Sequence, residues 1–270
     1  MNKKVVLVTG ASSGIGEAVS KALHVKGHRV FGASRKAVTG SVVDGIEFIQ
    51  MDVTDEKSVK EGITFLLSKS QGLDVVVNNA GLGMVGPVEN TSDEEARKIF
   101  DTNVFGVLNV CRVCIPHLRS RGGGYIINIT SLAAQMGLPF RGIYSASKFA
   151  VEGFTESLSQ EVIQFGIKVV LIEPGDFRTN INENRFSANS VDAAYGNQSQ
   201  KILDQVKREV ANAPTPEAIG NRIVAIIEDS NPYLRYRVAN LMQRFSLTLM
   251  RTLPSRWFEY LVMRHYKLRK

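Results

Sequence analysis

The sequence predicts an α/β fold: a doubly wound parallel sheet of about seven strands, followed by a C-terminal helical extension. Three observations predict it. Short runs rich in β-branched residues alternate with helix-like segments, the first run ends in a glycine-rich turn, and 270 residues suffice for one large α/β domain. Such runs are typical of buried parallel strands. Right-handed crossovers then place helices on both faces of the sheet.

The expected elements follow from the same alternation. Strands are expected at 5–8, 29–31, 46–49, 74–77, 125–129, 169–172 and 233–238. Helices are expected at approximately 15–26, 56–69, 94–119 and 143–164, with others after 215 and after 238. Ser92 and Glu95 have the spacing of a capping box. We expect one domain over 1–238, with a polar substrate loop at about 175–213, and a basic amphipathic helical extension over 239–270.

Charge and cysteine content narrow the partners and the compartment. The chain carries 33 Lys and Arg against 26 Asp and Glu. Residues 233–270 hold nine of the basic residues and one Glu, which leaves 24 basic and 25 acidic residues elsewhere. The body is therefore nearly neutral, and we expect no nucleic-acid partner. Two cysteines provide no disulfide framework. With no signal-like or spanning stretch visible, we expect a cytoplasmic protein that is at most peripheral to a membrane.

The first predicted strand leads into Thr9-Gly10-Ala11-Ser12-Ser13-Gly14-Ile15-Gly16, which opens a helix. Glycines in such a turn let the backbone approach a pyrophosphate closely, and the helix N-terminus supplies N–H groups to the anion. The turn lacks Gly-Lys-Ser/Thr, so it is not a phosphate loop of the NTPase kind. A glycine turn without a ligand is the alternative.

The end of the second strand indicates which dinucleotide binds. NAD-binding units place a carboxylate about 20 residues past the glycines to bind the ribose 2′-hydroxyl. Here no Asp or Glu occurs between Glu17 and Asp44, and the strand ends in Ser34-Arg35-Lys36. A guanidinium suits a 2′-phosphate. The pattern favours NADP(H) over NAD(H), the alternative being that Arg35 and Lys36 are merely a solvated loop.

Tyr144 and Lys148 are four residues apart on a predicted helix and so share one face. A free tyrosine has a pKa near 10, and a neighbouring ammonium favours the phenolate. Alone, this spacing also describes an ordinary surface pair.

Together these motifs resemble the short-chain dehydrogenase/reductase family, in its single-domain branch. The resemblance rests on the glycine turn, Asn78-Asn79-Ala80-Gly81 after the fourth strand, Asn103, Ser131 thirteen residues before Tyr144, Lys148, and Pro174-Gly175 after the sixth strand. It implies a Rossmann-type fold and a homodimer or homotetramer built on the helices near 94–119 and 143–164. One departure is Ser13, where many NADP-using members have a basic residue.

The resemblance also implies roles for individual residues. Tyr144 would be the general acid/base, and Lys148 would bind the nicotinamide ribose and lower the pKa of Tyr144. Ser131 would orient the reacting oxygen, and Asn103 would hold a water in a proton relay. The residues expected at the cofactor are Gly10, Ser12, Ser13, Gly14, Ile15, Gly16, Arg35, Asp52, Val53, Asn79, Ala80, Gly81, Tyr144, Lys148, Pro174, Gly175 and Thr179. No metal site is expected, and Cys111 and Cys114 are interpreted as small core residues.

The C-terminal extension has three interpretations. Val238, Leu241, Met242, Phe245 and Leu249 form an apolar stripe, and Arg237, Arg244 and Arg251 recur every seven residues. In the first, the helices would pack over the sheet edge and the site. In the second they would form a subunit contact, and in the third they would lie on an anionic membrane. The last interpretation resembles members that act on sterols and retinoids.

These observations predict an NADP(H)-dependent oxidoreductase that interconverts a secondary alcohol and a ketone on an apolar, steroid- or retinoid-like small molecule. Two alternatives stay open. One is an epimerase or dehydratase on the same scaffold, which the absence of a second domain for a nucleotide-sugar disfavours. The other is a non-catalytic nucleotide sensor, which the presence of Ser131, Tyr144 and Lys148 disfavours.

Overall fold

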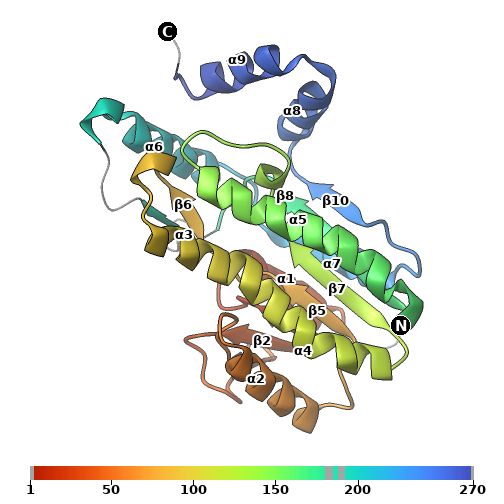
Figure 1. Ribbon diagram of the computed structural model, residues 1–270. Helices are drawn as coiled ribbons and strands as arrows, with labels where there is room; N and C mark the ends of the chain where they lie inside the picture. The colour runs from red at the N-terminus through yellow and green to blue at the C-terminus, as the bar shows by residue number, and fades with distance from the viewer. Residues whose placement is uncertain (1–2, 180–184, 188–191, 269–270) are drawn as a thin grey trace.

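The computed structural model describes residues 3–179, 185–187 and 192–268. Its centre is an eight-stranded sheet in the order β10-β8-β7-β5-β1-β2-β4-β3 (Figure 1). The strands are β1 (Val5–Thr9), β2 (Arg29–Ser34), β3 (Val42–Val43), β4 (Ile46–Gln50), β5 (Val75–Asn78), β7 (Gly124–Ile129), β8 (Ile167–Pro174) and β10 (Arg235–Val238). All pair in parallel except β3, which is antiparallel to β4. The doubly wound α/β prediction is confirmed, and the short β3 is an addition to it.

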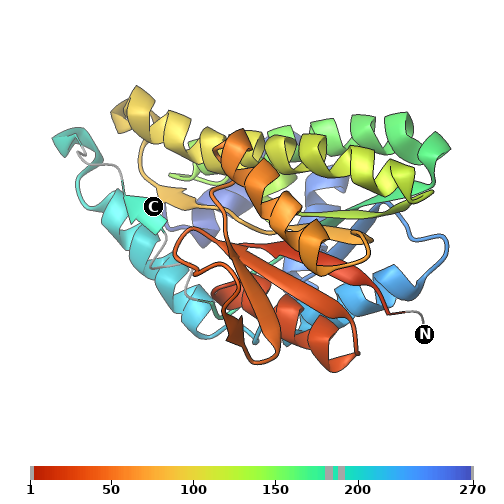
Figure 2. The ribbon, with the colours of Figure 1, turned by 90° about the horizontal axis from the view of Figure 1, so that it is seen from below.

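Helices cover both faces of this sheet (Figure 2). On one face lie α1 (Gly14–Val25) and α7 (Glu217–Glu228), whose apolar residues form one core with the sheet. On the other lie α2 (Glu56–Lys69), α4 (Gly106–Ser120) and α5 (Gly142–Val162), which form a second core. The side chains of β1 alternate between these cores, Val6 and Val8 facing one and Leu7 the other. This alternation of neighbouring side chains is why a buried parallel strand is apolar throughout.

The predicted helix at 94–119 is two helices joined without a break. Helix α3 (Asp93–Phe100) begins with the predicted capping box of Ser92 and Glu95, which the structure confirms. A π-helical turn over Asp101–Phe105 follows and leads into α4. In the described part of the chain, the continuous run Asp93–Ser120 passes a length and hydropathy test for a membrane span. Val110, Cys114 and Leu118 of this run are buried in the core against the sheet.

The segment expected to be a polar loop at 175–213 contains regular structure that the prediction missed. Helix α6 (Gln198–Ala211) buries Ile202, Val206 and Val210 at a spacing of four residues. Its remaining positions are mostly polar, which is why the pattern weakens in the sequence. Strand β9 (Arg185–Ser187) pairs with β6 (Gly83–Val85) in a separate parallel ribbon. Residues 180–184 and 188–191 of the expected loop lie outside the described residues.

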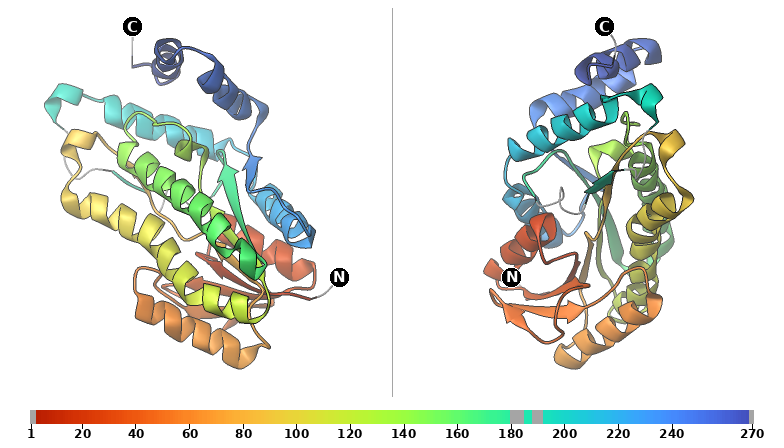
Figure 3. Two further views of the ribbon diagram at one scale, coloured as in Figure 1. Left: turned by 45° about the vertical axis from the view of Figure 1, so that its right-hand side comes forward. Right: turned by 90° about the vertical axis from the view of Figure 1, so that its left-hand side faces the viewer.

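The extension consists of α8 (Leu241–Thr252) and α9 (Ser255–His265), at the end of the molecule far from the N-terminus (Figure 3). Tyr266, just after α9, joins Val206 and Val210 of α6 in a small core cluster. The seven-residue spacing of Arg237, Arg244 and Arg251 does not place them on one helical face, because Arg237 lies on β10 opposite Glu173 of β8.

Close packing of α1 against α7 gives a test of the fold. A methyl group at Gly220 would lie 2.8 Å from Cβ of Ala22 and 2.9 Å from the carbonyl oxygen of Ala18. We expect Gly220→Ala to lower the free energy of unfolding by about 1–3 kcal/mol, because two packed helices must separate.

Gly153, on the exposed side of α5, is the matched control because no atom lies within 4 Å of its added methyl group. Gly153→Ala should raise stability by about 0.5–1 kcal/mol through helix propensity. Urea unfolding followed by circular dichroism measures both. Equal effects of the two substitutions would contradict the packing described.

Candidate active site

The glycine-rich turn forms a cradle at the carboxyl end of β1. Gly10 and Gly14 have φ of +65° and +61°, a region in which side chains are strained. A Cβ at Gly16 would collide with the Gly10 carbonyl oxygen and with the Asn79 amide. Ser13 precedes α1 in extended conformation, and its side chain makes no capping hydrogen bond. The turn therefore needs its glycines for backbone conformation and close approach, and it leaves the first turn of α1 uncapped by a side chain.

Asn79 ties this turn to the end of β5. Its side-chain Nδ2 donates to the carbonyl oxygens of Thr9 and Gly10 at 3.0 and 3.1 Å. In the other direction, Thr9 Oγ1 accepts from the backbone N–H groups of Asn79 and Ala80 at 3.0 and 3.1 Å. These four bonds hold the ends of two adjacent strands together, so Asn79 has a structural task besides its expected place at a nucleotide ribose.

A cavity of about 360 Å³, which we call the glycine-loop cavity, opens at this sheet edge. It gathers the predicted residues Gly10, Ser12, Ser13, Gly14, Ile15, Arg35, Asp52, Val53, Asn79, Ala80, Gly81 and Thr179. Gly16 lies beneath the turn instead. The cavity is also lined by residues outside the predicted set, among them Ser34, Lys36, Leu82 and Thr102. Leu82 and Thr102 could have been predicted to line the cavity, because they are the sequence neighbours of Gly81 and Asn103.

The chemistry of this cavity fits a dinucleotide ligand. Ser34 Oγ is buried and has no hydrogen-bond partner within the described residues, so a polar ligand group would satisfy it. Arg35 and Lys36 are exposed beside it, and neither forms an ion pair in the part of the chain that the structure describes. Asp52 Oδ1 accepts from the backbone and the hydroxyl of Thr54 at 3.0 and 2.8 Å.

The predicted catalytic residues come from two elements that pack against each other. Tyr144 and Lys148, which were also predicted at the cofactor, do not line the glycine-loop cavity, although Lys148 Nζ lies close to Gly81. Ser131 follows β7 and caps a short 3₁₀ helix, Leu132–Ala134, where its Oγ accepts from the Ala133 N–H at 3.1 Å. Tyr144, half-buried, lies in the first turn of α5, and Lys148 lies one turn further along the same helix. Lys148 Nζ donates to the carbonyl oxygen of Ile129 at 3.2 Å, which fixes α5 against the end of β7.

Burial lowers the pKa of Lys148 to about 8, against an opposing effect of the Glu152 carboxylate. An ammonium group loses its hydration when it is buried, so the neutral amine is favoured. Lys148 thus titrates close to neutral pH, where proton transfer is efficient.

Asn103 is fully buried in the π-helical turn. Its Oδ1 accepts from the Leu82 N–H at 2.7 Å, and its Nδ2 donates to the Leu82 carbonyl oxygen and to Ser147 Oγ, each at 3.0 Å. Ser147 Oγ in turn donates to the carbonyl oxygen of Tyr144 at 2.7 Å. Asn103 therefore couples the chain after β5 to the Tyr144 helix, and its predicted role in a water relay stays a prediction.

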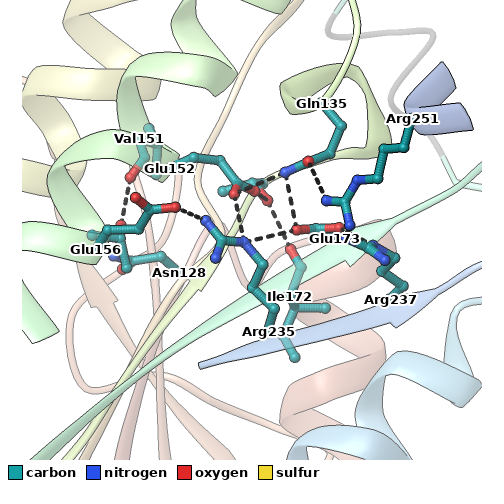
Figure 4. A network of polar contacts seen from close by, with 12 residues as sticks. Asn128, Gln135, Val151, Glu152, Glu156, Ile172, Glu173, Arg235, Arg237 and Arg251 are labelled. Atoms are coloured by element: carbon teal, nitrogen blue, oxygen red, sulfur yellow. Dashed lines mark hydrogen bonds and ion pairs between the residues drawn. The ribbon is translucent and has the colours of Figure 1, made fainter. Parts of the chain in front are cut away.

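A buried network of charges joins α5 to β8 and β10 (Figure 4). Glu152 and Glu173 are almost inaccessible, and Gln135 Nε2 donates to both carboxylates at 3.1 and 3.2 Å. Arg235 Nε lies 3.1 Å from Glu152 and 3.3 Å from Glu173, and Arg237 Nε lies 2.8 Å from Glu173. Burial and the nearby Glu173 raise the pKa of Glu152, although Thr130 and Arg235 oppose this. Sequence reasoning missed this network because its members are far apart along the chain.

A second cavity of about 460 Å³, which we call the C-terminal cavity, begins at Ser131. Pro174 and Gly175 line it, rather than the glycine-loop cavity where the prediction grouped them. Apolar side chains form much of its wall: Leu132, Met136, Leu138, Met242, Leu249, Phe258, Leu261 and Val262. Five of these belong to α8 and α9 of the extension. Val238 belongs to the sheet core instead. Of the three interpretations of the extension, packing over the site is therefore present in the structure.

Other predicted features are less informative. Cys111 and Cys114 are buried free thiols, and burial raises the pKa of Cys111 to about 12, as expected of core residues without reactivity. Among the described residues, no group of three or more His, Cys, Asp or Glu side chains is arranged to hold a metal ion.

Comparison with known proteins identifies the family. Residues 4–190 match the family described as short chain dehydrogenase. The chain is 36% identical over its whole length to a 3-ketodihydrosphingosine reductase of Bacteroides thetaiotaomicron, which is also covered completely. Retinol dehydrogenase 8 of Homo sapiens is 33% identical, over 93% of this chain and 86% of that one. A short-chain dehydrogenase of Streptomyces avermitilis superimposes with a TM-score of 0.82 at 31% identity, covering 98% of each chain. The chain belongs to the short-chain dehydrogenase family and is an oxidoreductase with a Rossmann fold.

Solved structures of similar fold contain either dinucleotide. A 3-ketoacyl-(acyl-carrier-protein) reductase of Brucella melitensis, 25% identical with a TM-score of 0.76 over 89% of this chain and 98% of that one, was solved with NADH. A short-chain dehydrogenase of Burkholderia cenocepacia, 24% identical with a TM-score of 0.75 over 96% and 98%, was solved with NADP. The fold alone therefore accommodates both.

The buried amine of Lys148 gives a test by stability. Its pKa falls from 10.5 in the unfolded chain to about 8, so at pH 7 the folded chain holds a buried ammonium. Lys148→Met removes that charge and should stabilise the nucleotide-free protein at pH 7 by on the order of 3 kcal/mol.

The sign of the pH dependence follows from the same shift. Between pH 8 and 10.5 the unfolded chain binds a proton that the folded chain does not, so wild-type stability rises with pH and the advantage of the variant disappears. Thermal unfolding at pH 7 and above pH 9 measures the effect, with the exposed Lys57→Met as control. An advantage that is constant with pH would contradict the assignment.

Proposed function

We propose that this chain is an NADP(H)-dependent oxidoreductase that interconverts a secondary alcohol and a ketone on an apolar substrate. The observation that carries the proposal is the position of Ser131. Ser131 lines the apolar C-terminal cavity. It also lies at the carboxyl end of the parallel strands, where Arg35 lines the glycine-loop cavity. A substrate and a dinucleotide bound at this edge would meet beside the helix of Tyr144 and Lys148.

Each side chain has a task in this proposal. A bound nicotinamide dinucleotide supplies or accepts the hydride. Tyr144 gives a proton to the carbonyl oxygen during reduction and takes it from the alcohol during oxidation. Ser131 Oγ accepts from the Ala133 N–H, and its own proton can be donated to that oxygen to orient it. Lys148 holds the ribose of the dinucleotide, and its ammonium group favours the phenolate of Tyr144.

The proposed preference for NADP(H) rests on charge. Arg35 and Lys36 line the glycine-loop cavity. The Asp52 carboxylate of the same cavity accepts two hydrogen bonds from Thr54. A guanidinium forms charge-assisted hydrogen bonds with a phosphate, and a carboxylate that would repel it is missing at the end of β2.

The proposed substrate is a steroid- or retinoid-like molecule or a long-chain keto lipid. The wall of the C-terminal cavity is mainly apolar, but two of its polar atoms, Arg141 Nε and Gln243 Oε1, are buried without a partner within the described residues. Such atoms would bind a polar group on an otherwise apolar molecule. The likeness to the 3-ketodihydrosphingosine reductase and to retinol dehydrogenase 8 supports the same class.

The expected homodimer or homotetramer is part of the proposal. Phe105, at the end of the π-helical turn, and Phe149 of α5 are both exposed. Large apolar side chains exposed on neighbouring helices are typical of subunit contacts. Light scattering of the purified protein gives the oligomeric state.

The reaction is tested by oxidation of NADPH in the presence of steroid ketones, retinal, 3-ketodihydrosphingosine and small keto-esters. We expect turnover with at least one apolar ketone. Tyr144→Phe should lower its kcat by roughly 10²- to 10⁴-fold, because the proton donor is lost, while NADPH binding measured by fluorescence stays close to normal. Tyr233→Phe, at a side chain 78% exposed on the way into β10, is the matched control. Retained turnover in Tyr144→Phe would refute the mechanism.

The cofactor preference is tested by reversing the charge of Arg35. Arg35→Glu should weaken the binding of NADPH by about tenfold or more, because one charge-assisted contact becomes a repulsion. It should also shift the NADPH-to-NADH ratio of kcat/KM towards NADH. Lys26→Glu, at an exposed site after α1, is the control and should leave the ratio unchanged. The proposal fails if the unaltered enzyme prefers NADH or if Arg35→Glu leaves the ratio as it was.

A further inference from the structure

The two helices of the extension expose a set of large apolar side chains. We call this set the exposed helix face and define it as Leu241, Met242 and Phe245 of α8 with Trp257, Tyr260 and Leu261 of α9. Leu241 and Met242 are 82% exposed, Trp257 is 66% exposed, and the others range from 40% to 59%. Leu241 and Phe245, like Trp257 and Leu261, are four residues apart and so lie on one side of their helix. So many large apolar side chains exposed on two consecutive helices are unusual unless a partner covers them.

The charge around this face is of one sign. Residues 239–270 contain seven Lys and Arg against the single acidic residue Glu259. Arg244, next to Phe245, and Arg264, one turn after Tyr260, are exposed on the same helices. Arg235 and Arg237 do not add to this charge, because they are paired with buried carboxylates inside the molecule. Apolar and aromatic side chains flanked by arginines are typical of helices that lie in the interface of an anionic bilayer.

The C-terminal cavity opens at the same face. Met242 and Leu261 line the cavity and are also exposed members of the exposed helix face. A molecule leaving the cavity past these two side chains would therefore emerge directly onto the apolar surface. This continuity argues for a lipid phase in contact with the surface rather than for a folded protein, because an apolar substrate could then enter without crossing water.

We infer that the exposed helix face of α8 and α9 docks this enzyme on an anionic membrane surface, with the mouth of the C-terminal cavity against the bilayer. Phe245 and Trp257 insert at the level of the acyl chains, and Arg244 and Arg264 contact lipid phosphates. The entry of substrate from the bilayer rests on the proposed function, whereas the docking itself does not require it.

Sedimentation with lipid vesicles tests the docking without any turnover. The full-length protein is mixed with vesicles of phosphatidylcholine alone and of phosphatidylcholine with phosphatidylglycerol. We expect binding to the anionic vesicles that weakens with added salt, and much weaker binding to the neutral ones. The double variant Phe245→Gln/Trp257→Gln should lose roughly tenfold or more of the binding, since two apolar anchors no longer leave water.

Two further variants complete the design. Val25→Gln/Ile163→Gln removes two side chains that are 81% and 72% exposed elsewhere, and it should bind like the unaltered protein. Arg244→Gln/Arg264→Gln should lower binding to anionic vesicles only. All three double variants change exposed residues and should unfold at the temperature of the unaltered protein.

The outcomes separate docking from the alternatives. Failure of the unaltered protein to sediment with anionic vesicles overturns the inference. A changed oligomeric mass for Phe245→Gln/Trp257→Gln, with vesicle binding intact, also overturns it and assigns the face to a contact between copies of the chain. Vesicle binding without reduction of any ketone overturns the proposed function and supports the docking. Reduction of a ketone without vesicle binding overturns the docking and supports the proposed function.

Discussion

Two buried carboxylates organise the side of the molecule on which the proposed substrate binds. Glu152 of α5 and Glu173 of β8 lie close enough for Gln135 to donate to both. Such a pair is strongly destabilising unless cations neutralise it. Arg235 and Arg237 provide those cations from β10, whose register places Arg237 opposite Glu173. The last strand of the sheet is thereby fixed beside β8, and the extension that follows it has to begin next to Gly175, which lines the C-terminal cavity.

The same network connects to the residues proposed to be catalytic through short paths. Glu152 lies one helical turn beyond Lys148, and Gln135 follows the 3₁₀ helix that Ser131 caps. Arg251 of α8 also reaches Gln135, at 3.5 Å, so the extension contacts the loop that carries Ser131. On the opposite side, Asn103 and Ser147 link the chain after β5 to the backbone of Tyr144. The Tyr144 helix is therefore held from both sides by buried polar contacts, as the proposed role of Tyr144 as proton donor would require.

The two cavities differ in chemistry as a dinucleotide and an apolar ketone would require. Backbone groups, the buried Ser34 hydroxyl and two cations line one cavity. The wall of the other is mainly apolar, and helices α8 and α9 contribute a large part of it. Those helices bury only part of their apolar surface in doing so, because Met242 and Leu261 face both the cavity and the exterior. One pair of helices would thus shape the pocket and provide its contact with a membrane.

The sequence alone determined the central sheet and most of its helices. Buried parallel strands, glycine turns and capping boxes are local patterns, so β1, β2, β4, β5, β7 and β8 of the central sheet and the capping box of Ser92 were predictable from neighbours along the chain. Tertiary structure alone decided what lies together from distant segments. It paired Arg235 and Arg237 with Glu152 and Glu173, and it moved Pro174 and Gly175 to the second cavity. It also formed α6 from a mostly polar segment, because burial of Ile202, Val206 and Val210 depends on partners such as Tyr266, which are remote in sequence.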